Sequence, residues 1–129
     1  MTNNDMKRWI DISWLDTTEP HDYPAAASYL SLLFPSSQVQ RYITALKKAD
    51  IEFFKAKDIF RASHLSLLGV SNSHVQKDQE KMRAQIPLSP LLLVRDPKVS
   101  WLLIADGYHR LCAVYAYDED ALIPCKIVD

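Results

Sequence analysis

Glycine is scarce in this chain, which contains only Gly69 and Gly107 among its 129 residues. Glycine adopts backbone conformations that other residues avoid, and it lets another group come close to the main chain because it has no Cβ. Each of the two therefore needs a physical reason. Gly107 has the clearer one, because it lies between the apolar segment 101–105 and a stretch with helical spacing. This junction is the first place to look for a site.

Cysteine and long apolar runs are also scarce. Cys112 and Cys125 form neither a Cys-x-x-Cys pair nor a zinc-binding pattern, so no metal ligands are expected from them. Their apolar neighbours predict that both are buried packing residues. No apolar run approaches membrane-spanning length, and none follows the N-terminal Met-Thr-Asn-Asn-Asp-Met-Lys-Arg. We expect a cytoplasmic protein with reduced thiols and no membrane partner.

An excess of basic charge is absent as well. The chain has 15 Lys and Arg against 16 Asp and Glu, a formal net charge of −1. This balance argues against non-specific binding of DNA or RNA, although a local basic patch stays open. Hydrophobic residues make up 48% and charged residues 24%, as in ordinary globular proteins. The length suits a single domain over 1–129.

The first fifty residues read mainly as helical. Alternating apolar residues over 9–15 favour a short strand. A helix is predicted over 23–34 with Asp22 as its N-cap. A second helix is predicted to begin at the capping box Ser37-x-x-Gln40 and to end near the two lysines at 47 and 48. We treat 1–50 as an N-terminal helical extension.

From residue 52 strands and helices are mixed, which predicts an α/β fold (α+β in some schemes). A strand over 52–59 leads into a helical turn near 61–65. The capping box Ser73-x-x-Gln76 opens a helix to about residue 85. The expected elements that follow are a buried strand 91–94, a turn 95–98, a returning strand 99–105, a helix 108–117 and a strand 123–128.

The junction around Gly107 concentrates polar chemistry. A helix N-terminus offers unpaired N–H groups and the positive end of the helix dipole, which suit a phosphate or carboxylate. Arg110 carries a permanent cation whose fork matches phosphate oxygens, and His109 can donate to a phosphate or carry a proton. Asp106 has three readings: a metal ligand, a base for a substrate hydroxyl, or an N-cap bonded to the N–H of His109.

A second basic feature precedes the junction in sequence. His74, Lys77 and Lys81 fall on one face of the helix predicted over 73–85. Such a face can line a phosphate pocket. It can equally be a solvated surface whose charge is balanced by Asp78 and Glu80, and the spacing leaves both readings open.

The stretch Asp106-Gly-Tyr-His-Arg110, preceded by an apolar strand and followed by Leu-Cys-Ala, resembles the phosphate-binding motif of the ParB/sulfiredoxin superfamily. The resemblance covers residues 52–128 and implies a small mixed sheet with flanking helices. Members bind ATP, ADP or CTP through the motif. Its Asp-Gly-x-His-Arg form is closest to the free-serine kinase branch, in which the aspartate assists catalysis. That branch also has an acidic residue upstream of the motif, and Asp58 is the candidate for it in this sequence.

The resemblance implies binding of a nucleotide or other phosphorylated small molecule, with Mg²⁺ as a candidate cofactor. Phosphoryl transfer or nucleotide hydrolysis would use Asp106 and His109. Sulfiredoxin activity is not expected, because Tyr108 stands where that branch has its cysteine. A non-catalytic module that controls a protein partner or homodimer, and a DNA-associated role, remain alternatives. The expected phosphate- or nucleotide-binding residues are His74, Lys77, Gly107, Tyr108, His109 and Arg110.

Overall fold

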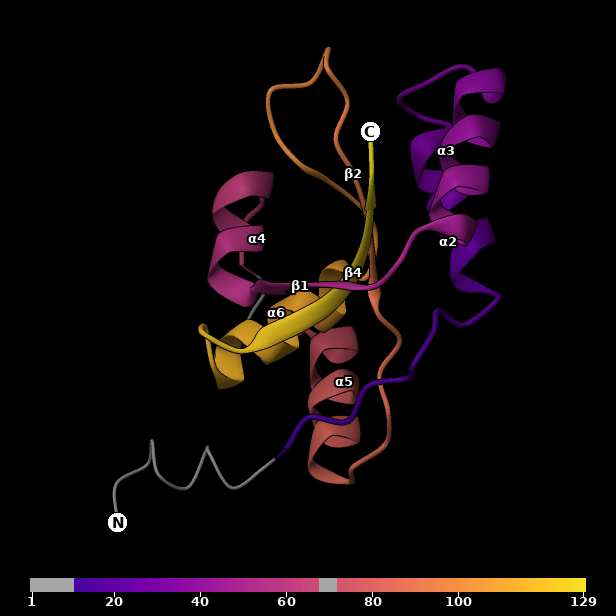
Figure 1. Ribbon diagram of the computed structural model, residues 1–129. Coiled ribbons are helices and arrows are strands. Elements are labelled where there is room, and N and C mark those ends of the chain that lie inside the picture. Colours follow the sequence, from indigo (N-terminus) through magenta and orange to yellow (C-terminus); the bar gives the residue numbers. More distant parts are fainter. Residues whose placement is uncertain (1–10, 68–71) are drawn as a thin grey trace.

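Helices cover both faces of a four-stranded sheet in the computed structural model, which describes residues 11–67 and 72–129 (Figure 1). The sheet order is β1 (Glu52–Lys55), β4 (Leu122–Val128), β2 (Leu91–Val94) and β3 (Leu103–Asp106). β2 and β4 pair in parallel at the centre, and both outer pairs are antiparallel. The sheet is therefore mixed, and the predicted α+β class is confirmed.

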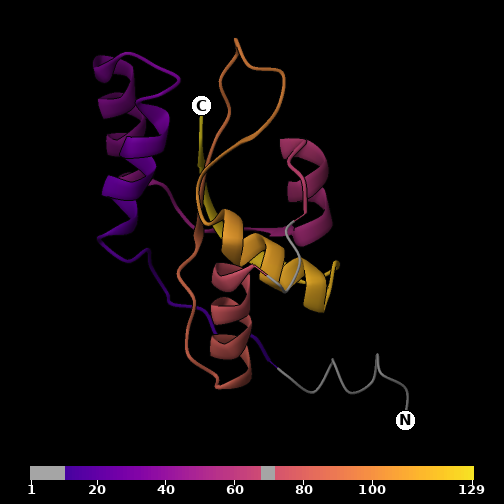
Figure 2. The same ribbon diagram turned by 180° about the vertical axis from the view of Figure 1, so that it is seen from behind.

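Alternation along β2 explains the two helical layers. Leu91 and Leu93 pack into one core with α4 (Ala56–Ser63), α5 (Ser73–Arg83) and α6 (Tyr108–Tyr117). Leu92 and Val94 point the other way, into a core with α2 (Asp22–Leu30) and α3 (Ser36–Lys48). Figure 2 shows α5 and α6 beside each other on the first face. A strand buried on both faces needs the continuous apolar run that the sequence has here.

The predicted caps of the first two helices are wrong. Asp22 is the first residue of α2 rather than its cap, and its side chain is buried. α3 begins at Ser36, after Pro35, and no side chain caps it, so Ser37 and Gln40 do not form a capping box. The carbonyl of Pro35 instead accepts from the backbone N–H groups at 38 and 39.

The predicted strand 52–59 is also too long, since β1 ends at Lys55 and α4 begins at Ala56. Ala56, Ile59 and Ser63 are buried at i, i+3 and i+7, a helical spacing that the strand interpretation overlooked. Backbone bonds from the N–H groups at 56 and 57 to the carbonyls at 121 and 119 direct the chain out of the sheet.

The returning strand is shorter than the predicted 99–105. β3 begins at Leu103, because the Leu102 N–H donates to the Ala62 carbonyl at 2.8 Å and ties residues 95–102 to α4. The antiparallel pairing of β2 with β3 is confirmed, with a register shift between Leu92 and Leu93. The α6 bounds agree with the predicted 108–117, and β4 starts one residue early.

Two further predictions are corrected at the ends of elements. α5 is capped by Asn72, whose Oδ1 accepts from the His74 and Val75 N–H groups, rather than by Ser73. Of the strand predicted over 9–15, the first two residues lie outside the described part. The remainder makes one isolated parallel bridge, between Trp14 and Leu88, and joins no sheet.

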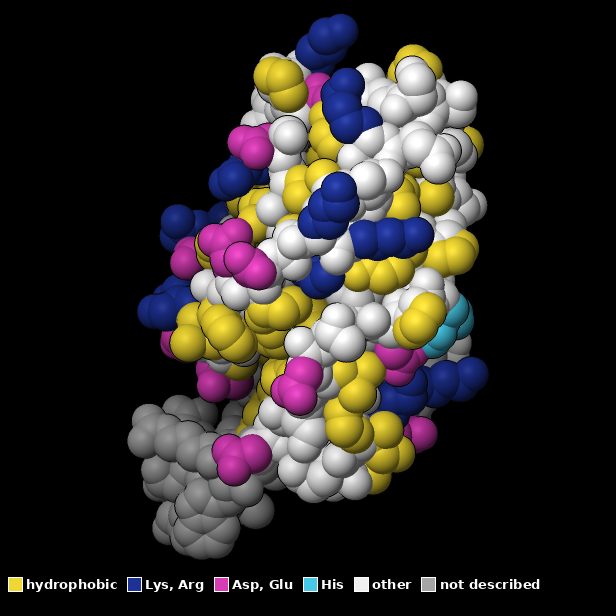
Figure 3. Space-filling model, turned by 45° about the vertical axis from the view of Figure 1, so that its right-hand side comes forward, with side chains coloured by type: hydrophobic (Ala, Val, Ile, Leu, Met, Phe, Trp, Pro, Cys, Tyr) yellow, Lys and Arg dark blue, Asp and Glu magenta, His cyan; other side chains and the backbone are white. Residues whose placement is uncertain are grey.

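The surface on the α2 and α3 side mixes basic and acidic side chains with apolar ones, in keeping with the balanced charge (Figure 3). In the described part of the chain, no helix is long and apolar enough to cross a membrane.

Candidate functional site

The N-terminus of α6 forms a sharp junction with β3. Gly107, the N-cap, has φ of +107°, in the left-handed region that side chains disfavour. A Cβ there would also lie 2.7 Å from Leu91 Cγ and 3.0 Å from an Arg110 nitrogen. Glycine is therefore required by backbone conformation and by tight packing. The alternative in which Asp106 caps the helix is wrong, because Gly107 holds the N-cap position and the Asp106 carboxylate accepts from Arg110.

This junction borders a cavity of about 260 Å³ between α5 and α6. Gln79 of α5 helps to hold the two helices together by donating to the Ala113 carbonyl at 3.4 Å. The structure thus brings the basic face of α5 against the junction motif, two features that lie about thirty residues apart in sequence. The cavity is lined by His74, Lys77, Asp78, Lys81, Asp106, Gly107, Tyr108, His109 and Arg110.

Arg110 lies between two carboxylates at one side of this cavity. One guanidinium nitrogen is 3.0 Å from Asp106 Oδ2 and 3.4 Å from Asp22 Oδ2, and it also approaches the Pro90 carbonyl at 3.5 Å. The Arg110 side chain is 17% exposed, and its Nε is buried without a hydrogen-bond partner in the structure. The guanidinium is thus held in place before any ligand arrives.

Asp22 is the site residue that sequence reasoning missed, because it was interpreted as a helix cap. Its side chain is 4% exposed, and Oδ2 accepts from the Ser89 hydroxyl at 2.5 Å as well as from Arg110. The Ser89 hydroxyl in turn accepts from the Glu19 N–H. Asp22 and Arg110 lie 88 positions apart, so no local pattern signals their contact.

The surroundings of Asp106 change the pKa of its carboxyl group. Burial raises the pKa of Asp106, and the neighbouring Asp22 raises it further, while the Arg110 guanidinium opposes both. A carboxyl group with a raised pKa exchanges its proton closer to neutral pH than a solvated one. Asp106 therefore holds its proton more tightly than a solvated carboxyl group does.

Histidine and acid side chains meet on the α5 side of the cavity. The rings of His74 and His109 are 4.7 Å apart, centroid to centroid. Burial lowers the pKa of His109, and proximity to His74 lowers it further. Burial also raises the pKa of Asp78, against the pull of Arg110 and Lys81. A bound anion would reverse the effect on His109 by favouring the imidazolium form.

Other candidates lie away from this cavity or face another partner. The Tyr108 hydroxyl donates to the Ser66 carbonyl, so the hydroxyl already has a partner although the residue lines the cavity. Asp58, the candidate upstream acid, lies on α4 and lines a separate cavity. Cys112 and Cys125 are fully buried as expected, and burial raises the pKa of Cys125 to about 12.

One cluster with metal-ligand spacing occurs in the described residues, at Glu19, His21 and Asp22. His21 Nε2 lies 2.8 Å from Glu19 Oε2 and 3.3 Å from Asp22 Oδ1. These are ion-pair distances from one ring nitrogen, and Asp22 already accepts from Ser89 and Arg110, so its carboxylate has partners without an ion. The cluster also stands beside the positive end of α2, which disfavours a cation.

Comparison of the chain with protein-family models, curated proteins and solved structures found no match.

Proposed function

We propose that the cavity at the N-terminus of α6 binds the phosphate of a nucleotide or other phosphorylated small molecule. The observation that carries the proposal is the convergence of the basic face of α5 with the uncapped N-terminus of α6 on one cavity. Backbone N–H groups at a helix start and surrounding cations are the two elements of a phosphate site. Neither element alone carries the argument.

The charges divide into two groups with different roles. Arg110 is already paired with Asp106 and Asp22, so it mainly positions these carboxylates and contributes little net positive charge. Lys77 and Lys81 make no ion pair with a carboxylate in the described part of the chain, and both line the cavity. These two lysines supply the attraction for a phosphate, against the Asp78 carboxylate that lines the same cavity, and His109 offers a hydrogen-bond donor.

The size of the cavity limits what it encloses. At about 260 Å³ it falls just below the usual range of about 300–1,000 Å³ for ligand pockets. A phosphate and its adjoining atoms fit inside such a volume, while most of a nucleotide would lie outside. The proposal therefore covers small phosphate esters as well as ATP, ADP and CTP.

A catalytic form of the proposal assigns Asp106 as the base that accepts a proton from a substrate hydroxyl, with His109 stabilising negative charge. Mg²⁺ prefers one or two carboxylates together with substrate phosphates and water. Where Asp106 is a metal ligand instead of the base, it would supply that carboxylate from the cavity lining, and the ion would neutralise phosphate charge. The resemblance to the ParB/sulfiredoxin superfamily agrees with this chemistry.

A binding module without catalysis is the second candidate. The favouring observation is the close ion pair between Asp106 and Arg110, which assigns Asp106 a structural role. Asp106→Asn separates the two forms, because it would abolish turnover while leaving phosphate binding in place. Retained turnover would remove Asp106 from the catalytic form.

Calorimetric titration tests the proposal with ATP, ADP, CTP and inorganic phosphate, each with and without Mg²⁺. The variants are Lys77→Met and His109→Asn, with Lys48→Met on α3 as the matched surface control. Each site variant is expected to weaken binding by about fivefold, the effect of one partly exposed charge contact. These variants avoid Arg110, whose loss would leave Asp22 buried without its cation.

Binding that is unchanged in both site variants, or weakened equally by Lys48→Met, would place the ligand elsewhere. Failure of all four ligands to bind the unmodified protein would end the proposal.

A further inference from the structure

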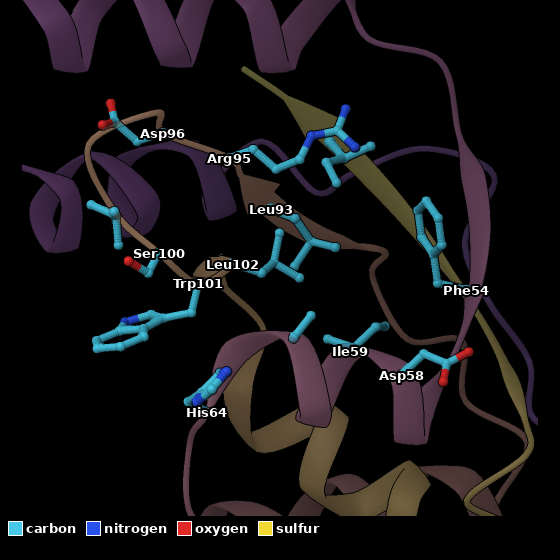
Figure 4. A pocket seen from close by; sticks show the side chains of 13 residues that line it. Phe54, Asp58, Ile59, His64, Leu93, Arg95, Asp96, Ser100, Trp101 and Leu102 are labelled. Atoms are coloured by element: carbon cyan, nitrogen blue, oxygen red, sulfur yellow. The ribbon is translucent and has the colours of Figure 1, made fainter.

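A second and larger cavity, of about 540 Å³, lies at the opposite end of the sheet, between α4 and residues 95–102 (Figure 4). The bond from the Leu102 N–H to the Ala62 carbonyl closes one side of it. Its volume falls within the usual range for small-molecule sites, about 300–1,000 Å³. It shares no lining residue with the phosphate cavity, so the two are independent features of the molecule.

The floor of this second cavity is apolar. Side chains from three strands and from α4 meet there, and Figure 4 shows Leu93, Leu102 and Ile59 in the middle of the view. An apolar floor beneath an open mouth favours a ligand that removes a hydrophobic surface from water. The aliphatic side chains and aromatic ring that form it are Phe54, Ile59, Leu93, Val99, Leu102 and Ile127.

One wall is formed by two flat rings. The His64 and Trp101 rings are 5.2 Å apart with an angle of 32° between their planes. His64 has the left-handed backbone conformation, φ +59°, and follows directly after α4. Trp101 remains 50% exposed although it lies beside an apolar floor. A half-exposed indole next to a cavity offers a stacking surface for a planar ring.

The other side carries the charge that orients a ligand. Arg95 is a positively charged residue that lines the cavity. Its contact with Asp129 is long, at 3.8 Å, and both side chains are exposed. Such pairs contribute little, so the guanidinium can exchange this partner for another carboxylate. Asp96 does not compete, because its Oδ2 accepts from Tyr42 and Gln38 and its Oδ1 from the Lys98 N–H.

Asp58 sets the direction of the ligand. Its carboxylate lines the part of the cavity that Figure 4 shows below Phe54, separate from Arg95. Asp58 contacts Arg61 at 3.8 Å, as loosely as Arg95 contacts Asp129. Because neither Arg61 nor Asp129 lines the cavity, an anionic group would be repelled at Asp58 and attracted at Arg95. From these features we infer that the cavity binds a planar aromatic carboxylate, with its ring between the apolar floor and Trp101 and its carboxylate on Arg95.

The test uses 2-naphthoate and its neutral analogue 2-naphthalenemethanol as probes. Each probe is titrated into the full chain, and its binding is measured from ¹H–¹⁵N NMR spectra. The Trp101 indole N–H signal, assigned with Trp101→Phe, is expected to shift with 2-naphthoate. Arg95→Gln is expected to weaken 2-naphthoate binding by about fivefold and to leave the neutral probe unaffected. Arg83→Gln on α5 is the matched control and should change neither affinity.

A second variant, Ala62→Leu, fills the cavity from α4 and is expected to weaken both probes. Ala62 is exposed and its carbonyl bond to Leu102 is made by the backbone, so the fold is retained. No shift at Trp101 up to millimolar probe, or equal 2-naphthoate binding by Arg95→Gln and the unmodified protein, would overturn the inference. Calorimetry with ATP is expected to be unaffected by Arg95→Gln, so failure here leaves the phosphate proposal standing.

Discussion

At the scale of residues, the arrangement of Asp106, Arg110 and Asp22 decides how the phosphate cavity behaves. A buried charge triad of this kind is costly to break, because removing one partner leaves the others unpaired in a poorly solvated place. Arg110 therefore has less freedom to move onto a ligand than its place in the motif suggested. The cations of α5 gain importance for the same reason.

The pH dependence of stability follows from the raised pKa of Asp106. The folded protein binds this proton more tightly than the unfolded chain, whose ordinary value is 3.8. The protonated Asp106 therefore makes its full contribution to the free energy of unfolding below pH 3.8. This contribution is lost as the pH rises through the folded-state pKa. Because Asn cannot ionise, the stability of Asp106→Asn relative to the unmodified protein should increase as pH rises from 3.8 towards 7.

Urea unfolding of both proteins across this pH range measures the difference. Asp50→Asn, which removes an exposed carboxylate after α3, serves as the control. A difference that stays constant with pH, or that moves the other way, would contradict the assignment of burial as the dominant influence on Asp106.

At the scale of elements, α5 carries the basic face, and its start depends on one side chain. Asn72→Ala removes the cap and should lower the free energy of unfolding by about 1 kcal/mol. Ser73→Ala is the matched control and should cost much less, because Ser73 lies inside the helix. Chemical unfolding measures both, and a larger loss for Ser73→Ala would restore the capping box that the sequence predicted.

Elements were predictable where the local signal and the tertiary contacts agree. β2 has the continuous apolar run that burial on both faces requires, and α6 begins directly after Gly107, one of only two glycines in the chain. The bounds of β1 and β3 were not predictable, because bonds from distant segments end these strands. The Leu102 N–H donates to the Ala62 carbonyl instead of to a neighbouring strand, and no sequence pattern around residue 100 predicts this partner.

At the scale of the whole molecule, the helices of the first fifty residues cover β2 and β3 on one face of the sheet. They bury Leu92 and Val94, and they bring Asp22 to Arg110. Lys126 of β4 adds polar links, since its Nζ donates to the Tyr23 hydroxyl and the Lys47 carbonyl. These helices are part of the packing that holds the sheet and the phosphate cavity.

A fragment of residues 51–129 is therefore expected not to fold, because one face of β2 and β3 would be exposed to water. Circular dichroism and the dispersion of NMR signals measure this directly. Co-expression of residues 1–50 as a separate chain is expected to restore the folded state. A fragment that unfolds cooperatively on its own would show that the remaining 79 residues form an independent domain.

The sequence by itself determined the α+β class, the buried central strand, the helix after Gly107 and the basic face of α5, because each depends on residues within a few turns of one another. Only the tertiary structure decided that this face borders the Gly107 junction, that Asp22 holds Arg110, and that Asp58 belongs to a different cavity. Those contacts join segments up to 88 positions apart. They form because both faces of one small sheet must be buried, a requirement that acts on the whole chain at once.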